Sequence, residues 1–138
     1  MPYELNWESA GVHKRLFGHV TPPELHESGQ RLAADARFDA TRFIINDYSG
    51  VQSHTLTPDD FDEVAALQLG AYATNPNVLV VYVTTDEALA QMVRHSLMQP
   101  PSASYEVIVV PDMAQARECL AQRRQGTGLV LPRRFGRA

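Results

Sequence analysis

The run Val78-Leu79-Val80-Val81-Tyr82-Val83 limits more than any other feature what this chain can fold into. It is apolar at every position, whereas a strand with one face in water alternates apolar and polar residues. A strand without alternation is buried on both faces, as in a parallel sheet that helices cover. We therefore predict an α/β domain in which the strand from Val78 to Thr84 lies in the middle of the sheet.

Shorter patterns supply the other strands. Residues 3 to 7 and 12 to 20 each alternate apolar and polar positions, with Gly11 at the turn between them. This pattern predicts an antiparallel hairpin at the start of the chain. Two further strands are expected at Arg42 to Tyr48 and at Tyr105 to Val110.

Helix starts fall between these strands. Thr21-Pro22-Pro23-Glu24 and Thr57-Pro58 each place a capping threonine before a proline at the first helical position. Thr84-Thr85-Asp86-Glu87 offers a further capping box, and Asp112 caps a last helix. Asn75-Pro76 ends the second helix. The predicted order is ββαβαβαβα, with a mixed, mostly parallel sheet and a leading β-hairpin.

Composition limits the compartment and the class of protein. A chain of 138 residues that is 44% hydrophobic fits one domain with a single core. Cys119 is the only cysteine and cannot form an internal disulfide. No apolar run approaches about 18 residues, and the first four residues lack the features of a signal peptide. We expect a cytoplasmic protein that does not associate with membranes.

Charge is distributed unevenly along the chain. Five of the 12 basic residues are arginines that follow Gln122, so residues 1–122 hold 7 basic and 16 acidic residues, a net charge of −9. A body this negative repels the phosphates of nucleic acids. We expect a domain at residues 1–122, a basic tail at residues 123–138 and no nucleic-acid partner.

Asp47, Ser49 and His54 form the grouping that most suggests catalysis, a hydrolase triad within eight residues. A nucleophilic serine needs a base and an oxyanion hole in fixed geometry, and the chain has no Gly-x-Ser-x-Gly elbow. We instead expect Asp47 and Ser49 to bond backbone amides in a turn at Ser49-Gly50. No catalytic residue is predicted.

The histidines do not form a metal-ligand pattern. His13 and His19 share one side of their strand but lie roughly 20 Å apart, at about 3.3 Å per residue. Neither His26 nor His95 has a second ligand at a familiar spacing. No nucleotide-binding motif is present either, so we predict no metal site and no cofactor.

The segment Asp47-Tyr48-Ser49-Gly50-Val51 resembles the Asp-Leu-Ser-Gly-Val signature of STAS domains. The hairpin, the Thr-Pro helix start, the Arg37-Phe38-Asp39 turn and the Asn75-Pro76 helix end follow in order. Together they make residues 1–122 similar to the bacterial SpoIIAA-like (STAS/Sec14-like) family. The resemblance implies a single STAS-like domain that acts as a non-enzymatic protein-interaction or regulatory module with a protein partner.

The resemblance also implies where that partner binds, namely the loop from Ser49 to Thr57 and the start of the following helix. The residues expected to contact it are Asp47, Ser49, Gly50, Ser53, Thr57, Asp59 and Asp60. In STAS antagonists a serine at this helix start is phosphorylated, and the register places Thr57 there as its stand-in. Thr57 is equally explained as a helix N-cap.

An alternative follows from the Sec14-like part of the resemblance, which implies a small apolar ligand or lipid between the helices and the sheet. Its lining would be Phe61, Tyr72, Met92 and Met98. Helical periodicity equally assigns these four side chains to a filled core, and the sequence leaves both interpretations open.

The tail carries one feature of its own. Leu129-Val130-Leu131 is a short apolar run of β-prone residues between Gly128 and Pro132. With the neighbouring arginines it is expected to dock either on the acidic body or on a second copy of the chain, which would give a homodimer.

Overall fold

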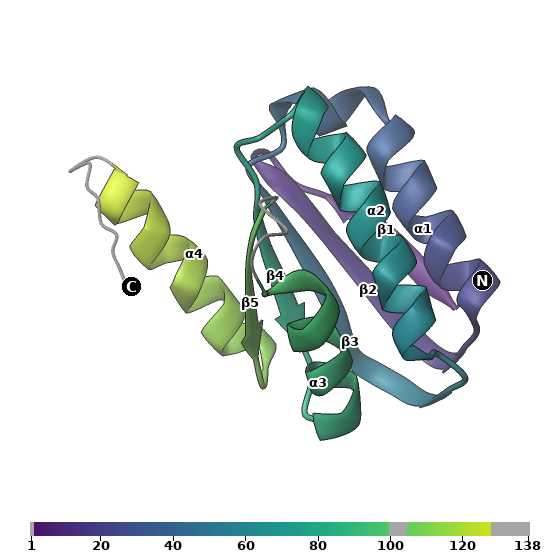
Figure 1. The fold of residues 1–138 in the computed structure, drawn as a ribbon. Coiled ribbons are helices and arrows are strands. Elements are labelled where there is room, and N and C mark those ends of the chain that lie inside the picture. Colours follow the sequence, from purple (N-terminus) through teal and green to yellow (C-terminus); the bar gives the residue numbers. More distant parts are fainter. Residues whose placement is uncertain (1, 100–104, 128–138) are drawn as a thin grey trace.

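The computed structural model describes residues 2–99 and 105–127. Helices cover a five-stranded mixed sheet whose strands follow one another in chain order, β1-β2-β3-β4-β5 (Figure 1). The strands are β1 (Tyr3–Trp7), β2 (Gly11–Val20), β3 (Phe43–His54), β4 (Leu79–Val83) and β5 (Glu106–Val110). The predicted α/β class with a mixed, mostly parallel sheet is confirmed.

Within the described residues, four α-helices and one short 3-10 helix alternate with the strands. They are α1 (Pro22–Ala34), η1 (Ala36–Ala40), α2 (Pro58–Thr74), α3 (Glu87–Leu97) and α4 (Met113–Thr127). Thr21 and Thr57 precede α1 and α2, as predicted. The cap of α3 differs, because Asp86 rather than Thr84 accepts the helix amide, from Leu89 at 3.2 Å.

The predicted hairpin is confirmed, since β1 and β2 pair antiparallel with Tyr3 opposite Leu16. The other strands pair in parallel. The prediction that the apolar run lies in the middle of the sheet is wrong by one strand, because β3 holds that place and β4 lies between β3 and β5. An apolar run indicates that a strand is buried on both faces but not which place it takes in the sheet. Every residue of β4 is indeed buried.

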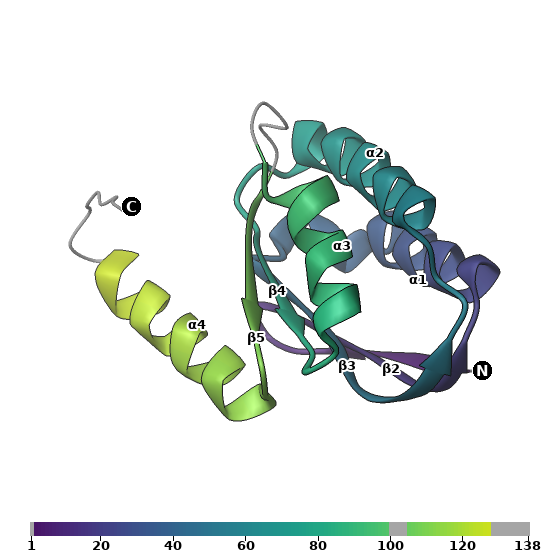
Figure 2. The same cartoon turned by 60° about the horizontal axis from the view of Figure 1, so that its bottom comes forward.

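The two faces of the sheet are covered unequally. Helices α1, α2 and α3 lie on one face and α4 lies on the other (Figure 2). The larger core, under the three helices, includes Val12, Leu16, Leu25, Phe61, Val80, Leu89 and Val93. The smaller core, where α4 packs on β3, β4 and β5, includes Ile45, Val81, Val83 and Ala116.

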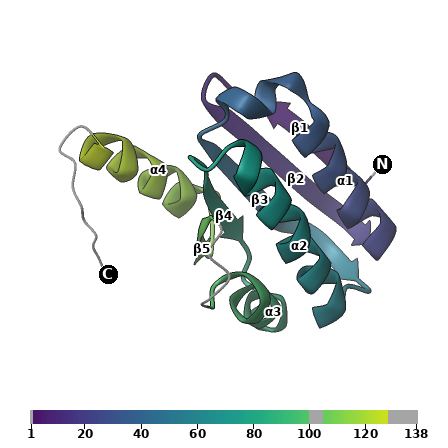
Figure 3. The same ribbon diagram turned by 45° about the horizontal axis from the view of Figure 1, so that its top comes forward.

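Helices α1 and α2 lie side by side over the sheet (Figure 3). Gly29 of α1 is where they approach closely, because a Cβ atom built there would come within 2.9 Å of Leu67 of α2. A glycine at this point therefore lets the two helices meet above the larger core.

The predicted end of the third strand is wrong. Instead of turning at Ser49-Gly50 after Tyr48, β3 continues to His54 alongside the ten-residue β2. Two irregularities in the pairing make this possible, one between Arg15 and Phe17 and one between Gly18 and His19. Gly18 has a φ of 67°, a conformation that suits glycine. The polar segment that resembles a turn in sequence is thus bulged strand.

The last helix passes beyond the predicted domain end at Gln122, because α4 runs to Thr127. Arg123, predicted to belong to the tail, forms an ion pair with Glu106 at 2.6 Å. Residues 128–138 lie outside the described residues, and so does the predicted docking of Leu129-Val130-Leu131.

Candidate functional site

The predicted partner-binding residues lie near the ends of the parallel strands. We call this region the carboxyl edge; it comprises the second half of β3, the residues that follow β4 and β5, and the first turns of α2 and α3. Its predicted contact residues differ in exposure: Ser49, Ser53, Thr57 and Asp59 are exposed, Gly50 and Asp60 are half-buried, and Asp47 is buried. Six of the seven are therefore at least partly open to a partner.

The carboxylate of Asp47 is engaged in hydrogen bonds with neighbouring residues. Its carboxylate accepts the backbone amide of Ser49 at 2.9 Å, the hydroxyl of Ser49 at 2.6 Å and His13 Nε2 at 2.8 Å. Burial would raise the pKa of Asp47, but the hydrogen bonds from Ser49 and His13 outweigh it, so this pKa lies below its ordinary value. The prediction that Asp47 bonds a backbone amide is confirmed, and Asp47 holds the bulge rather than facing a partner.

The side chains of the suspected triad are not arranged for nucleophilic catalysis. The hydroxyl of Ser49 donates to Asp47, and Asp47 also meets His13, so the carboxylate stands between the serine and the histidine. His54 is engaged elsewhere, because it accepts the amide of Leu56 at 3.0 Å and faces Asp86 at 3.5 Å. A serine nucleophile instead needs its hydroxyl on the base.

Two hydrogen bonds join Thr57 and Asp60 at the start of α2. The Asp60 carboxylate accepts the amide of Thr57 at 2.7 Å and its hydroxyl at 3.0 Å. His26 of α1 lies 3.4 Å from Asp60 and 2.9 Å from Glu63. Thr57 thus acts as a helix cap while its side chain stays exposed.

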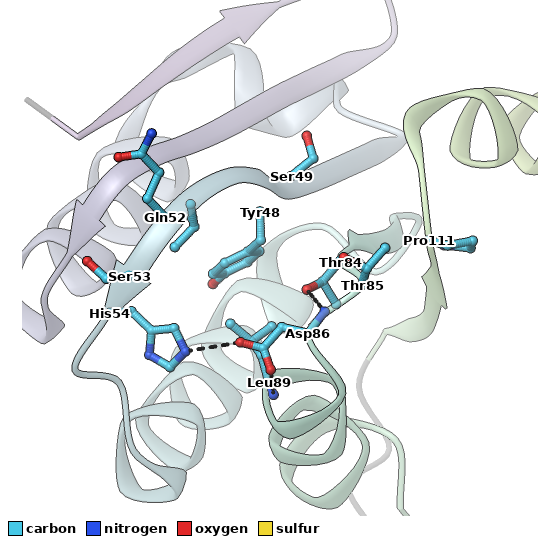
Figure 4. Close-up of a pocket in the computed structure, with 11 residues that line it drawn as sticks. Tyr48, Ser49, Gln52, Ser53, His54, Thr84, Thr85, Asp86, Leu89 and Pro111 are labelled. Atoms are coloured by element: carbon cyan, nitrogen blue, oxygen red, sulfur yellow. Dashed lines mark hydrogen bonds and ion pairs between the residues drawn. The ribbon is translucent and has the colours of Figure 1, made fainter.

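A pocket of about 170 Å³ opens beside these residues (Figure 4). Tyr48, Ser53 and His54 of β3 form one wall, and the other is formed by Leu89 of α3 and by Asp86, the residue that caps this helix. Burial, together with nearby Tyr82, raises the pKa of Tyr48, whose buried hydroxyl has no hydrogen-bond partner among the described residues.

The exposed rim of the carboxyl edge is acidic. Its exposed carboxylates are Asp59, Asp62, Glu63, Asp86 and Glu87. Their contacts include the hydroxyl of Ser96, which donates to Asp62, and Arg94, which pairs with Glu87. The exposed rim therefore presents negative charge to a partner.

The residues predicted to line an apolar ligand site are dispersed. Phe61 is fully buried in the larger core, Met92 is half-buried against it, and Met98 is 41% exposed after the end of α3. Tyr72 lines a groove of about 1180 Å³ beside α4, where its ring meets that of Tyr105 edge-on at 5.3 Å.

The sequence interpretation missed a cavity of about 60 Å³ between α1, α2 and the sheet. Lys14, Asn46 and Tyr82 form a row across its floor, because they are register partners on β2, β3 and β4. Gln68 of α2 lines the cavity from the helix side, and its side-chain carbonyl is buried without a hydrogen-bond partner among the described residues. We call these four side chains the interior polar cluster.

Lys14 is the unusual member, because it is the single lysine of the chain. It is 6% exposed, and burial lowers its pKa to about 8. The signal was present in the sequence, since period-2 alternation puts Lys14 on the same inward side as Val12 and Leu16. The sequence interpretation followed the apolar positions of that strand and passed over the charge between them.

The described residues contain no group of three side chains suited to hold a metal ion. None of the helices in residues 2–99 and 105–127 is long and apolar enough to span a membrane. Comparison of the chain with protein-family models and with curated proteins found no match.

Proposed function

We propose that this protein is a non-enzymatic protein-interaction or regulatory module of the STAS-like type, acting in the bacterial cytoplasm through its carboxyl edge. One observation carries the proposal. Ser49, Ser53, Thr57 and Asp59 are exposed along one continuous stretch of chain, from the bulged half of β3 to the first turn of α2. The nearby hydrogen bonds of Asp47 and Asp60 hold backbone in place, which suits a rigid binding surface.

The charge of this surface sets the chemistry of the partner. The five exposed carboxylates of the rim favour a basic protein segment, and charge of this kind steers association and is screened by salt. Thr57 offers a point of regulation. A phosphate on its exposed hydroxyl would face the carboxylate of Asp60, which now accepts that hydroxyl at 3.0 Å.

The test is capture of a partner by tagged protein from the native cytoplasm, with two variants of equal charge change. Asp59→Asn, Asp62→Asn and Glu63→Gln together neutralise part of the rim. Glu4→Gln, Glu27→Gln and Asp39→Asn together make the same change at exposed positions elsewhere. We expect the rim variant to lose the partner and the control variant to keep it.

Two results would contradict the proposal. One is equal capture by both variants, which would move the binding surface away from the carboxyl edge. The other is turnover of an ester or phosphate substrate that Ser49→Ala abolishes, which would make the protein an enzyme.

A second candidate function is the binding of a small ligand between the helices and the sheet, as the Sec14-like resemblance implies. The interior polar cluster favours it, because the buried side-chain carbonyl of Gln68 has no hydrogen-bond partner among the described residues, and most such groups in proteins have one. At about 60 Å³ the cavity is far smaller than a lipid requires.

A further inference from the structure

The pocket of about 170 Å³ at the carboxyl edge, which we call the edge pocket, contains a buried hydroxyl without a partner. Tyr48 is 4% exposed, and its hydroxyl has no hydrogen-bond partner among the described residues. The hydroxyl points to the side of the pocket where Ser53 and His54 lie (Figure 4). Most buried polar groups in proteins have a partner, so an incoming group gains a hydrogen bond here that the chain alone does not make.

A carboxylate oxygen in the edge pocket is also open to an incoming group. Oδ1 of Asp86 accepts the amide of Leu89 at 3.2 Å, whereas Oδ2 faces His54 Nε2 at 3.5 Å, which is longer than an ordinary hydrogen bond. The side chain of Asp86 is 49% exposed, so a partner can reach it. Asp86 and Glu87 already complement the positive N-terminus of α3, which leaves an anion little to gain there.

The open groups of the edge pocket favour a cationic donor. The hydroxyl of Ser53 is already joined to His19 at 2.7 Å. That of Thr84 accepts the backbone amide of Asp86 at 3.0 Å. The tyrosine oxygen and the aspartate carboxylate remain, and both accept hydrogen bonds. No lysine or arginine among the described residues lines the pocket, so a cation there meets the carboxylate without competition from a basic side chain of the chain itself.

The size of the edge pocket distinguishes between the two basic side chains. A protein cavity of about 150 Å³ encloses benzene, which has six heavy atoms, or about 25 Å³ for each. By that measure a pocket of about 170 Å³ takes about seven heavy atoms, the number in an arginine side chain and two more than in lysine. A guanidinium group offers five donors in one plane, enough for a carboxylate and a hydroxyl at once. Val51 and Leu89 also line the pocket and suit the aliphatic part of the side chain.

We propose that the edge pocket takes an arginine side chain of the protein partner, whose guanidinium pairs with Asp86 and donates a hydrogen bond to the hydroxyl oxygen of Tyr48. Arginine anchors in such pockets carry much of the binding energy of many protein interfaces. The inference rests on the proposed protein-interaction function, because it names the side chain by which the carboxyl edge holds a basic partner. The rim variant changes Asp59, Asp62 and Glu63, none of which lines the edge pocket, so the two proposals can fail separately.

Propylguanidinium is a suitable probe, because it has the seven heavy atoms of an arginine side chain. In ¹H–¹⁵N NMR spectra of the unmodified chain we expect it to shift the amides of Ser53, Thr85 and Asp86 saturably. Propylurea has the same shape and no charge, and it should shift none of them at equal concentration. Butylammonium ends as a lysine side chain does and should bind about fivefold more weakly, because it offers fewer donors and fills less of the pocket.

Matched variants locate the probe. Tyr48→Phe removes only the hydroxyl and should weaken propylguanidinium binding by about threefold to tenfold. Tyr82→Phe makes the same change in the ring stacked on Tyr48 and should have no effect, because Tyr82 does not line the edge pocket. Asp86→Asn keeps a residue suited to cap α3 but removes the charge, and it should weaken binding about tenfold or more. Asp39→Asn makes the same charge change at an exposed position before β3 and should bind the probe as the unmodified protein does.

The capture experiment extends the test to the partner itself. Asp86→Asn should lose the partner, and Asp39→Asn should keep it. Tyr48→Phe should keep its melting temperature or raise it, because the hydroxyl that it removes has no partner in the folded chain. A weaker interaction in this variant therefore cannot be ascribed to unfolding.

Three outcomes would overturn the proposal. The absence of a saturable shift with propylguanidinium would leave water as the occupant of the pocket. Equal binding of propylurea or butylammonium would contradict the assignment of a guanidinium group. Equal binding of propylguanidinium by Asp86→Asn and Asp39→Asn would place the probe elsewhere. If the rim variant still loses the partner in any of these cases, the protein-interaction function stands without this anchor, whereas equal capture by the rim variant and its control would contradict that function whatever the probe does.

Discussion

The carboxyl edge and the interior polar cluster both collect polar side chains, but they differ in whether those side chains have partners. At the carboxyl edge, Asp47 accepts three hydrogen bonds and Asp60 accepts two from Thr57. In the interior, Lys14 and Gln68 have none among the described residues. Folding alone explains the first set, because each group stabilises local backbone. It does not explain the second, which costs free energy where it stands.

Candidate functional residues in this protein are therefore of two kinds, exposed ones that also hold the backbone and buried ones without a partner among the described residues. An exposed polar residue that also holds the backbone has a structural role even if a partner binds it. A buried polar residue without a partner destabilises the folded chain until something binds it. Replacing a buried residue of the second kind should therefore stabilise the fold, whereas replacing a residue of the first kind should destabilise it.

Lys14→Met should make the protein more stable. Burial lowers the pKa of Lys14 from 10.5 to about 8, which corresponds to a cost of about 3 kcal/mol for the charged amine at neutral pH. Methionine fills similar space without charge, so the free energy of unfolding in urea should rise by about 2–3 kcal/mol. Arg15→Met is the matched control, because Arg15 is 42% exposed on the opposite face, and it should change stability by less than about 1 kcal/mol. A loss of stability in Lys14→Met would show that Lys14 stabilises the folded protein instead of destabilising it.

The gain from Lys14→Met should depend on pH. The pKa of Lys14 is lower in the folded state, about 8, than in the unfolded chain, so the unfolded chain holds more protons between about pH 8 and 10.5. The stability of the unmodified protein should rise with pH across this window relative to Lys14→Met. The difference should be constant below pH 8 and nearly gone at about pH 10.5. Urea unfolding of both proteins at several pH values measures it, and a difference that does not vary would count against a buried charge.

Asp47→Ala should destabilise the protein by about 2 kcal/mol, because it leaves the amide and hydroxyl of Ser49 and the ring of His13 without their acceptor. The pKa of Asp47 is below its ordinary value in the folded state, so its contribution is present above about pH 4 and is lost as the pH falls further. Asp59→Ala, at an exposed position, should change stability by less than about 0.5 kcal/mol. Equal effects of the two variants would mean that the bulge does not depend on Asp47.

Thr57→Ala should cost about 1 kcal/mol through the loss of the helix cap, whereas Thr55→Ala, two residues earlier and exposed, should cost less. Thermal unfolding gives both values. If Thr57→Ala keeps its partner in the capture experiment, the role of Thr57 is limited to the start of α2.

Much of the fold followed from local patterns. The alternation of residues 3 to 7 and 12 to 20 predicted the hairpin, the Thr-Pro pairs predicted the starts of α1 and α2, and Asn75-Pro76 predicted the end of α2. These signals are reliable because capping and proline act within one turn of helix, and alternation follows from strand geometry. A further local rule, that short polar side chains bond nearby backbone amides, predicted the bond between Asp47 and the Ser49 amide, which spans two residues.

The sequence by itself determined the α/β class, the hairpin and most element boundaries, since each depends on neighbouring residues. Only the tertiary structure decided that β3 continues to His54, because the pairing that holds Ser49 to His54 comes from β2, more than thirty residues earlier. It also decided that Lys14, Asn46, Gln68 and Tyr82 share one cavity. Residues so far apart in the chain meet only when strands pair and α2 packs over them, and no local pattern records which buried polar groups then lack a partner.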